Sequence, residues 1–432
     1  MDPQQPGPPS QPGPYSQPGQ TPPPPPQPYG GSPGAYPPAG PRPQDQPRPY
    51  PPAPYPQPGP YPQQGPYPVP QPPVSHPQQQ GSYPPGQYPP PGPYPQQWAG
   101  PPPYPTQWAY REPRIIPAPP GTPFHRLART PKHAWWRPIL GTIFLAAGAL
   151  FLTGAVLIGW ELIHTGITGE FTEPQGNDIF PSDTENLAAT LVMLGVLTPF
   201  VMLTAWLIQR RPAWSVASVL NRIRWRWLLL CCLPALGYLA LSYTMGVLVD
   251  LIFPAKDSVS AGDGGSWVGF GAFAVPALVI LFLVPFQSAA EEFVFRGWLI
   301  QAVGAYGPDQ ADGRARWLRT LFRSPWPGIV IAGAAFVSAH GYTGWAMADI
   351  FLFAVTAGWL TVRTGGLEAG IALHTLNNLF AFLLPAATGQ LSTWDDQGSA
   401  PWTLLVADIP CLAFYAAAVM WLSRRREVAR VS

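Results

Sequence analysis

Eight hydrophobic segments follow residue 138, and they limit the fold of this chain more than any other feature. The segments are 139–162, 187–208, 228–251, 269–303, 327–341, 345–362, 367–385 and 402–422. Most of them approach or exceed the length of about 20 apolar residues that spans a bilayer as a helix. Because backbone groups in lipid must be satisfied within the spanning structure, helices are favoured. The sequence therefore predicts an all-α fold, a polytopic membrane protein of about eight transmembrane helices.

Basic residues gather in alternate connections between these segments. The clusters are Arg210 with Arg211, the arginines of 222–226, those of 314–323, and Arg424 to Arg426. With a cytoplasmic amino terminus, eight spans leave every cluster inside and put Lys256 as the only Lys or Arg in an outer loop. The excess of Lys and Arg in cytoplasmic loops predicts this orientation. We therefore expect a multi-pass protein of the cell membrane with cytoplasmic amino and carboxyl termini.

The chain before the first segment is of another kind. Residues 1–122 repeat Pro, Gln, Gly and Tyr with few charges, which predicts a disordered cytoplasmic tail rich in polyproline II conformation. The tail is either a solvated spacer or a docking arm for protein partners. Residues 123–138 are basic and aromatic, which favours an interfacial anchor. The stretch 214–227 alternates Arg with Trp and is predicted to lie at the inner membrane face.

The membrane part is predicted to have three divisions. Residues 139–268 hold the first three transmembrane helices and their loops, residues 269–385 hold the core helices that carry the polar motifs, and residues 386–432 hold the last helix and a basic carboxyl terminus. The expected surroundings are the lipid bilayer, and no nucleic-acid partner is expected.

The fourth segment carries charge inside an apolar stretch. Residues 286–301 read FQSAAEEFVFRGWLIQ and contain Glu291, Glu292 and Arg296. Ionisable groups at membrane depth are costly and usually mark function. Arg296 is four residues after Glu292, so the two share a helix face and can pair. Glu291 lies about 100° further round the helix and is left without a partner in its own segment.

Two other segments offer polar groups to the same region. His340 closes the fifth segment, whose roughly 14 residues rise only about 21 Å in a core of about 30 Å, so its imidazole could stay at membrane depth. His374 and Asn378 are four residues apart and share one face of the seventh segment. If the three segments converge, Glu291 can act as a general base on water, and His374 with Asn378 can stabilise an oxyanion.

By linear position, Glu291 lies toward the inner half of its segment and His340 toward the outer end of its own. They meet only if the fifth helix is short or tilted, or if the fourth is displaced at Pro285, which should kink it.

Each polar group also has a purely structural interpretation. Glu292 with Arg296 is most simply an ion pair, and His340 a hydrogen-bonded residue at a helix end. His374 with Asn378 could join helices, since buried polar side chains commonly bridge membrane helices. Asp349 and Asp408 belong to no motif and are interpreted as structural or of unknown role. Only the joint occurrence of the first three groups favours a functional site.

Three short motifs carry a family resemblance. Residues 291–296, EEFVFR, have the form EExxxR; residues 336–340, FVSAH, have the form FxxxH; and residues 374–378, HTLNN, have the form HxxxN. In this order, each in a hydrophobic segment, they resemble the CPBP family of CAAX proteases and bacteriocin-processing proteins, also called Abi. The resemblance covers about residues 269–385 and implies an intramembrane endopeptidase.

The resemblance also implies roles for individual residues. Glu291 would activate water with the assistance of His340, while His374 and Asn378 would form the oxyanion hole. Glu292 and Arg296 would be a structural pair beside the site. The family is described both as glutamate-dependent and as metallo-endopeptidase, so zinc is either a cofactor or not required; its candidate ligands are Glu291, His340 and His374. The sequence contains no HExxH motif of the common zincin type.

The leading functional hypothesis is an endopeptidase that hydrolyses a peptide or membrane-anchored protein substrate from a wet cavity between helices. The alternative is a non-catalytic membrane scaffold or bacteriocin-immunity protein that keeps the polar cluster for folding. A small transporter is a third interpretation, because intramembrane charges also mark ion paths, but the segments show no inverted repeat.

Overall fold

The structure is a computed structural model that describes residues 112–174, 178–253, 265–310, 313, 315–393 and 398–432. The tail predicted to be disordered therefore lies mostly outside the described residues. Its last part, residues 112–122, belongs to the folded unit: the Gly121 amide donates to the Ser432 carbonyl, and the Ser432 amide donates to the Thr122 carbonyl. Residues 112–122, which were predicted to belong to the tail, therefore include a segment hydrogen-bonded to the carboxyl-terminal residues.

Helices account for most of the described chain. The longer ones are α1 (Trp136–Thr168), α4 (Trp225–Ile252), α5 (Gly269–Glu291), α9 (Trp345–Thr364), α10 (Glu368–Thr388) and α11 (Trp402–Arg425). The shorter ones are α2 (Asp183–Gly195), α3 (Leu197–Leu207), α6 (Ile300–Gly304), α7 (Arg316–Arg323) and α8 (Trp326–Ser338). A π-helical stretch, η3 (Glu292–Leu299), joins α5 to α6. Three 3₁₀ turns complete the set: η1 (Phe124–Arg126), η2 (Ala213–Val216) and η4 (Leu391–Thr393).

The predicted membrane architecture is confirmed. Seven helical stretches in the described residues are long and apolar enough to cross a bilayer: α1, α2 with α3, α4, α5 through α6, α9, α10 and α11. The one predicted segment not among these seven is the fifth, residues 327–341. It forms α8, which is apolar but only 13 residues long. Large apolar side chains of α1 point outward, such as Leu150 at 77% exposed and Phe151 at 75%, because lipid rather than protein is their expected neighbour.

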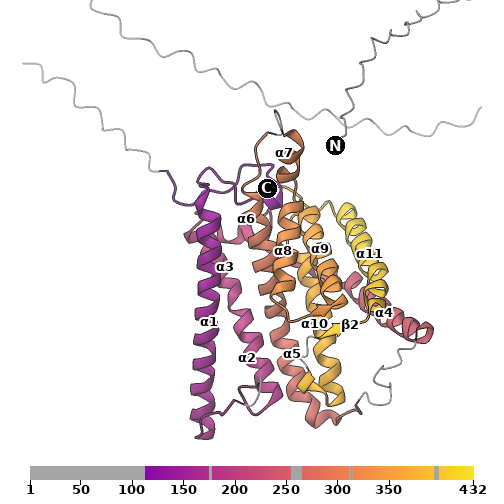
Figure 1. Cartoon of the computed structure of the whole chain (residues 1–432). Coiled ribbons are helices and arrows are strands. Elements are labelled where there is room, and N and C mark those ends of the chain that lie inside the picture. The colour runs from indigo at the N-terminus through magenta and orange to yellow at the C-terminus, as the bar shows by residue number, and fades with distance from the viewer. Residues whose placement is uncertain (1–111, 175–177, 254–264, 311–312, 314, 394–397) are drawn as a thin grey trace, which may run out of the picture. The chain divides into compact units, whose positions relative to one another are not determined.

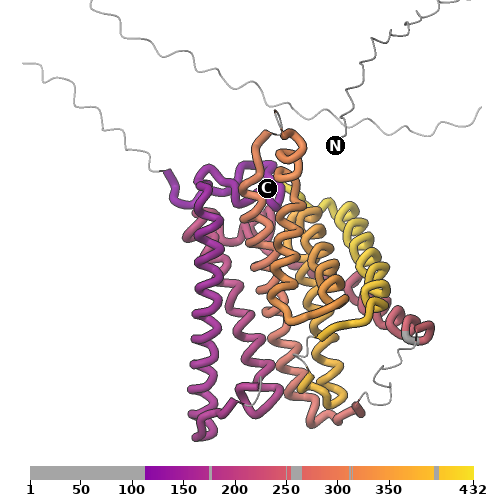
Figure 2. Tube along the Cα trace, in the orientation of Figure 1, coloured from indigo at the N-terminus to yellow at the C-terminus, as the bar shows by residue number. Residues whose placement is uncertain are grey.

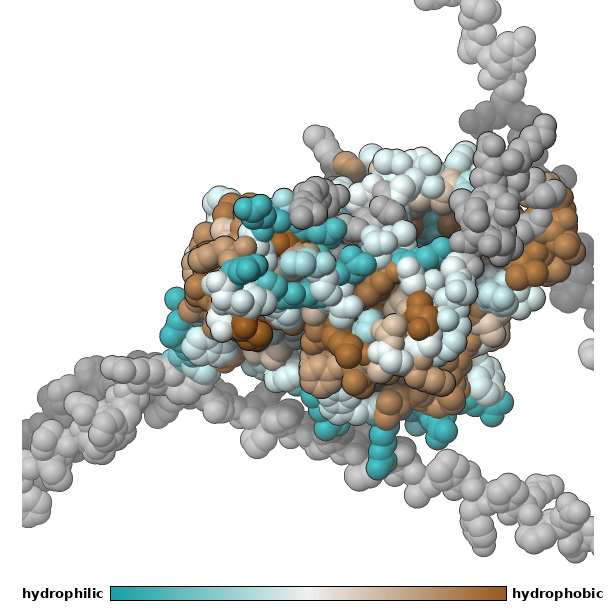
Figure 3. Space-filling view, turned by 90° about the horizontal axis from the view of Figure 1, so that it is seen from below, coloured by the Kyte–Doolittle hydropathy of each residue, from teal (hydrophilic) through white to brown (hydrophobic). Residues whose placement is uncertain are grey.

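The helices form one bundle, with α1 at one edge (Figure 1). Helix α10 packs against both α4 and α5, α2 packs against α5, and α11 packs against α4 and α9. Helices α8 and α9 pack on one another as a hairpin. Viewed from below, polar residues lie on the end face of the bundle with apolar residues beside them (Figure 3).

The described chain starts and finishes at the same end of the bundle (Figure 2). Pro123 and Val431 form an antiparallel bridge there. Such an arrangement agrees with an even number of passes. In this arrangement α8 runs into the bundle from the end where the described chain starts, and α9 returns to that end.

The turn after α8 is fixed by the only two strands among the described residues. Strand β1 (Thr343–Gly344) pairs in parallel with β2 (Ser399–Ala400), the segment just before α11. Gly344 has a φ of +56°, a backbone conformation that glycine adopts without a Cβ penalty. The chain can therefore reverse tightly between α8 and α9.

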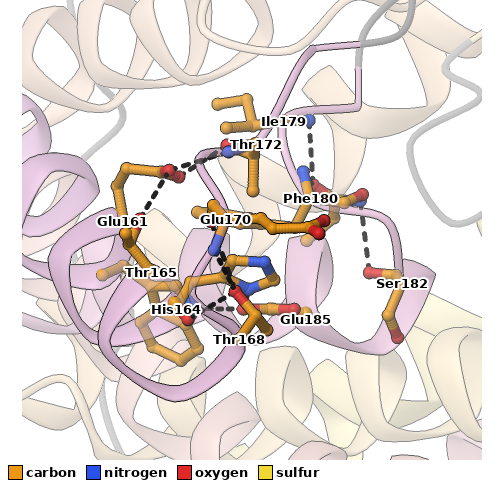
Figure 4. Close-up of polar contacts among 12 residues, drawn as sticks. Glu161, His164, Thr165, Thr168, Glu170, Thr172, Ile179, Phe180, Ser182 and Glu185 are labelled. Atoms are coloured by element: carbon orange, nitrogen blue, oxygen red, sulfur yellow. Dashed lines mark hydrogen bonds and ion pairs between the residues drawn. The ribbon is translucent and has the colours of Figure 1, made fainter.

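The α1–α2 connection closes through its own polar groups (Figure 4). Glu185 of α2 accepts from Trp160 Nε1 at 3.0 Å and contacts His164 Nδ1 at 2.9 Å. Glu161 accepts from both the amide and the hydroxyl of Thr172. Glu161 and Glu185, at the two ends of this connection, thus hold it in place through hydrogen bonds.

Two segments predicted to lie at the membrane surface are partly buried in the bundle. In the predicted anchor, Trp135 is 70% exposed, as expected, but Phe124 and Leu127 are buried. In the stretch 214–227, Ser215 through Val219 are buried. The Val219 amide donates to the Gly365 carbonyl, and the Leu367 amide donates to the Ala217 carbonyl. Residues 215–219 therefore pack beside α10, while Trp214 and Trp225 on either side of them are exposed. The location of this stretch at the inner membrane face stays a prediction.

Gly304 is the point of closest approach between η1 and α6. A Cβ at this position would overlap the carbonyl oxygen of His125, which is backbone and cannot move aside alone. We expect Gly304→Ala to destabilise the fold by about 1–3 kcal/mol through overpacking. Gly154→Ala is the control, because a Cβ there meets nothing within 4 Å. Thermal unfolding in detergent measures both; equal melting temperatures would contradict this packing.

The segment before α1 is also held by a pH-sensitive contact. Arg129 forms two hydrogen bonds to Asp309, of 2.9 and 2.7 Å, and Arg126 adds a third of 2.9 Å. These bonds, that to Arg129 first, lower the pKa of Asp309 below its ordinary value of 3.8. The stabilisation is therefore complete above the ordinary value and is lost as pH falls below it through the folded-state value.

We expect the amides of residues 123–135 to lose protection against hydrogen exchange below about pH 4. Protection is the ratio of the intrinsic rate at each pH, which itself falls in acid, to the observed rate. In Asp309→Asn the exchange should already be faster at neutral pH and should lose this dependence. Because Asp309 is largely exposed, the effect is modest. Identical acid profiles in both proteins would show that another group holds the segment.

Candidate active site

The short length of α8 brings the three motifs to one depth. Helix α8 ends at Ser338, so His340 follows it directly, and the turn after it lies partway along the bundle rather than at its end (Figure 1). Helix α5 is uninterrupted at Pro285 and continues to Glu291. Of the two routes by which Glu291 and His340 could meet, the structure uses the short fifth helix, and no break of α5 at Pro285 is required.

Glu291 is the centre of the cluster. Its side chain is 6% exposed, and its Oε2 has no hydrogen-bond partner among the described residues. The Nε2 atoms of His374 and His340 face this oxygen at 3.5 Å and 4.0 Å. Both distances exceed an ordinary hydrogen bond, so Oε2 and two imidazole nitrogens converge without satisfying one another.

Both imidazoles are oriented through their other nitrogen. His340 Nδ1 lies 2.7 Å from the Phe336 carbonyl oxygen, and His374 Nδ1 lies 2.9 Å from Glu292 Oε1. A carbonyl or an ionised carboxylate only accepts, so each Nδ1 carries the proton. In the neutral form of each ring, Nε2 then has a free lone pair directed at the region of Glu291.

Glu292 and Arg296 form the expected buried pair. Arg296 Nη1 lies 3.0 Å from Glu292 Oε1, with side chains 1% and 0% exposed. The distance makes an ion pair, but neither Arg296 amino nitrogen meets hydrogen-bond geometry with any described residue. The pair lies in the π-helical stretch η3, whose wider turn was not predicted. Single π-helical turns are frequent at functional sites.

Gln287 is the residue that the sequence interpretation missed. Its Nε2 donates to Glu291 Oε1 at 2.7 Å, and its Oε1 accepts from Asn378 Nδ2 at 3.2 Å. Glu291 therefore does have a partner in its own segment, which corrects the prediction. The signal was present, because Gln287 lies four residues before Glu291. Asn378 reaches Glu291 only through this carboxamide.

One aromatic ring packs against three members of the cluster. The ring of Phe336 lies 4.2 Å below the Arg296 guanidinium carbon, 4.5 Å from the His340 ring and 5.7 Å from the His374 ring. Cation–π and ring contacts of this kind hold side chains in one geometry. The first residue of the FxxxH motif thus positions the groups of the other two motifs.

A second buried ion pair fixes the start of α10. Arg224 contacts Glu368, which is fully buried, through Nε and Nη2 at 2.8 and 2.6 Å. Arg224 also donates to the carbonyls of Thr364 and Ala429. The bidentate geometry sets the position of the helix that carries His374 and Asn378. No pattern in the sequence pairs these two charges.

The donor set was tested against a metal ion. A tetrahedral zinc site needs nitrogen and oxygen ligands at about 2.0–2.2 Å from one point. Among the described residues, no group of three or more His, Cys, Asp or Glu side chains is arranged to hold a metal. Glu291, His340 and His374 are therefore not arranged as the three ligands of a metal ion in this structure.

The comparisons with known proteins agree with the position of this cluster. Residues 273–380, which contain all three motifs, match a family model described as "Type II CAAX prenyl endopeptidase Rce1-like". The chain is also 26% identical over 247 residues to the "Uncharacterized protein YyaK" of Bacillus subtilis (strain 168), a match covering 55% of this chain and 74% of that protein. No solved structure matches the chain. Residues 273–380 therefore form an Rce1-like domain, of the CAAX-type endopeptidase family that the three motifs predicted.

Proposed function

We propose that the chain is an intramembrane endopeptidase that cleaves a peptide or membrane-anchored protein and uses Glu291 to activate water. The observation that carries the proposal is the buried Oε2 of Glu291, which has no hydrogen-bond partner among the described residues and faces two imidazole nitrogens. An unpaired carboxylate oxygen at membrane depth is expensive. A group kept in this state is expected to act on something that enters the site.

The proposed reaction needs only side chains of the cluster. Glu291 Oε2 accepts a proton from a water molecule. The oxygen of that water molecule forms a bond to the carbonyl carbon of the scissile peptide. The carbonyl π electrons move to its oxygen. Asn378 donates to that oxyanion from its side-chain amide, and His374 donates from Nε2 in the imidazolium form of its ring. The electrons of the oxyanion then re-form the carbonyl as the C–N bond breaks, and the proton passes from Glu291 to the leaving amine. His340, with its Nε2 lone pair, assists the removal of the water proton.

Gln287 and Glu292 are positioning residues in this scheme. Gln287 fixes one oxygen of Glu291 and leaves the other facing the imidazoles. Glu292 holds the His374 ring through Nδ1. Second partners of this kind orient the groups that touch the substrate.

We further propose that both termini are cytoplasmic. The described ends meet on the same side of the bundle, and the arginine clusters of the connections support that side as the inner one. Labelling of single cysteines introduced at residues 178 and 309, in intact cells, tests it: only the first should react with an impermeant reagent.

The experiment that tests the function compares membranes from cells producing the full chain with those producing Glu291→Gln. New peptide termini that appear only with the intact glutamate are the expected result. If equal amounts of inserted protein give identical sets of termini, the chain is a scaffold or immunity protein, the alternative from the other class.

A further inference from the structure

A cavity outside the candidate active site is lined by residues of α4, α9, α10 and α11. Its volume is about 260 Å³. Asp349 of α9 and Asp408 of α11 line it, together with Asn377 of α10 and Tyr238 of α4. Other parts of its wall are apolar, formed by Leu239, Phe380, Leu404 and Ala407. The cavity therefore combines an apolar surround with two carboxylates.

The two carboxylates have no cationic partner. No Lys, Arg or His is among the described residues that line the cavity. Asp408 is 8% exposed, and the Tyr238 hydroxyl donates to its Oδ1 at 2.9 Å. Asp349 Oδ1 is buried and has no hydrogen-bond donor among the described residues. Both acids line the same cavity, so a cation that entered it would be attracted by both.

Asn377 links the wall of the cavity to the candidate active site. Its Nδ2 donates to Asn378 Oδ1 at 3.5 Å, and Asn378 is bonded through Gln287 to Glu291. A chain lying across the candidate active site would thus have this cavity beside it.

We propose that the cavity is a specificity subsite that takes one lysine or arginine side chain of the substrate, with Asp349 and Asp408 as the groups that bind its charge. This inference rests on the proposed function. At about 260 Å³ the cavity is smaller than the roughly 300–1,000 Å³ of pockets for drug-sized ligands, as expected for a single side chain. Lys and Arg have an apolar stem and a charged head, which matches the apolar walls and the paired acids.

The subsite would make the enzyme selective for substrates with a basic side chain, which is costly to place in the bilayer. Placing Lys or Arg at the centre of a bilayer costs about 2.5–3.5 kcal/mol on insertion scales. A substrate with a basic residue near the scissile bond recovers that cost only where carboxylates receive it. Asparagine at both positions removes the charge, keeps the shape and preserves an acceptor for Tyr238.

The first test maps cleavage sites in membranes from cells with the full wild-type chain, with Glu291→Gln, and with Asp349→Asn plus Asp408→Asn. Asp178→Asn, which removes an exposed acid of the α1–α2 loop, is the control. We expect Glu291-dependent sites to have Lys or Arg at one fixed position, and their cleavage to fall at least tenfold in the double variant only. Glu291-dependent sites without such a position would overturn the subsite and leave the protease intact. Absence of any Glu291-dependent site would overturn both.

A binding measurement separates the subsite from catalysis. The full chain carrying Glu291→Gln, in lipid nanodiscs, is titrated with n-decylammonium and with neutral n-decanol. Addition of Asp349→Asn and Asp408→Asn should weaken decylammonium binding at least tenfold and leave decanol unaffected, with unchanged thermal melting. Equal decylammonium affinity in both proteins would refute the subsite. Displacement by millimolar sodium alone would identify an inorganic-cation site instead, which also overturns it.

Discussion

Glu291→Gln is expected to lower peptide-bond hydrolysis by the purified, lipid-reconstituted protein by about 10²–10⁴-fold, the usual contribution of a positioned general base. The substitution keeps the shape of the side chain and an acceptor for the Gln287 amide, which donates to Glu291 Oε1 at 2.7 Å. It removes the negative charge and the basicity of the carboxylate that faces His374 and His340. The rate of product formation from a peptide identified in membranes is the quantity to measure.

Two controls make this result specific. Glu173→Gln removes an exposed acid from the α1–α2 loop and should leave the rate unchanged. Bound metal is measured in wild type and in Glu291→Gln, and the wild-type rate is taken before and after chelation. An unchanged rate in Glu291→Gln would end the assignment of this residue as the base. Loss of the wild-type rate on chelation and its recovery on adding zinc, together with loss of bound metal in Glu291→Gln, would instead assign Glu291 as a ligand.

The parts of the fold that follow from one-dimensional patterns were predictable. Each hydrophobic segment became a helix because lipid requires internal backbone bonding. The spacing of four that links Glu292 with Arg296 and His374 with Asn378 survives in the structure as one shared face in each case. The length of the fifth segment also predicted that His340 lies partway along the bundle, because the rise of a helix per residue is fixed.

What the sequence did not predict depends on contacts between distant segments. Arg224 and Glu368 are 144 residues apart, and no local pattern couples them. The burial of residues 215–219 goes with hydrogen bonds to the turn before α10, which no local pattern in that stretch predicts. The π-helical stretch at Glu292 arises where η3 packs against α3, α8 and α9. Asp349 and Asp408 had no motif, and only the bundle brings them into one cavity.

Glu292→Gln is expected to destabilise the protein by about 3–5 kcal/mol, because it leaves the Arg296 guanidinium buried without its counter-charge. Arg296 is 1% exposed, and its other close neighbour is the face of Phe336 at 4.2 Å. The single variant Arg296→Met should be less costly, since Glu292 retains the His374 imidazole at 2.9 Å. The free energy of unfolding, measured by titration of a mild detergent with SDS, compares the two.

The double variant decides whether the pair acts as a unit. With both charges removed, no uncompensated ion remains, so Glu292→Gln with Arg296→Met should be more stable than the sum of the single effects by about 0.5–3 kcal/mol. The exposed pair Arg129 and Asp309 is the control, because solvent screens it and its cycle should show little coupling. Simple additivity at Glu292 and Arg296 would mean that the two charges are stabilised separately, by His374 and Phe336. In that case EExxxR marks a catalytic glutamate beside two independent buried charges. Coupling would instead mean that Glu292 and Arg296 stabilise one another, and that this pair positions the His374 ring beside Glu291.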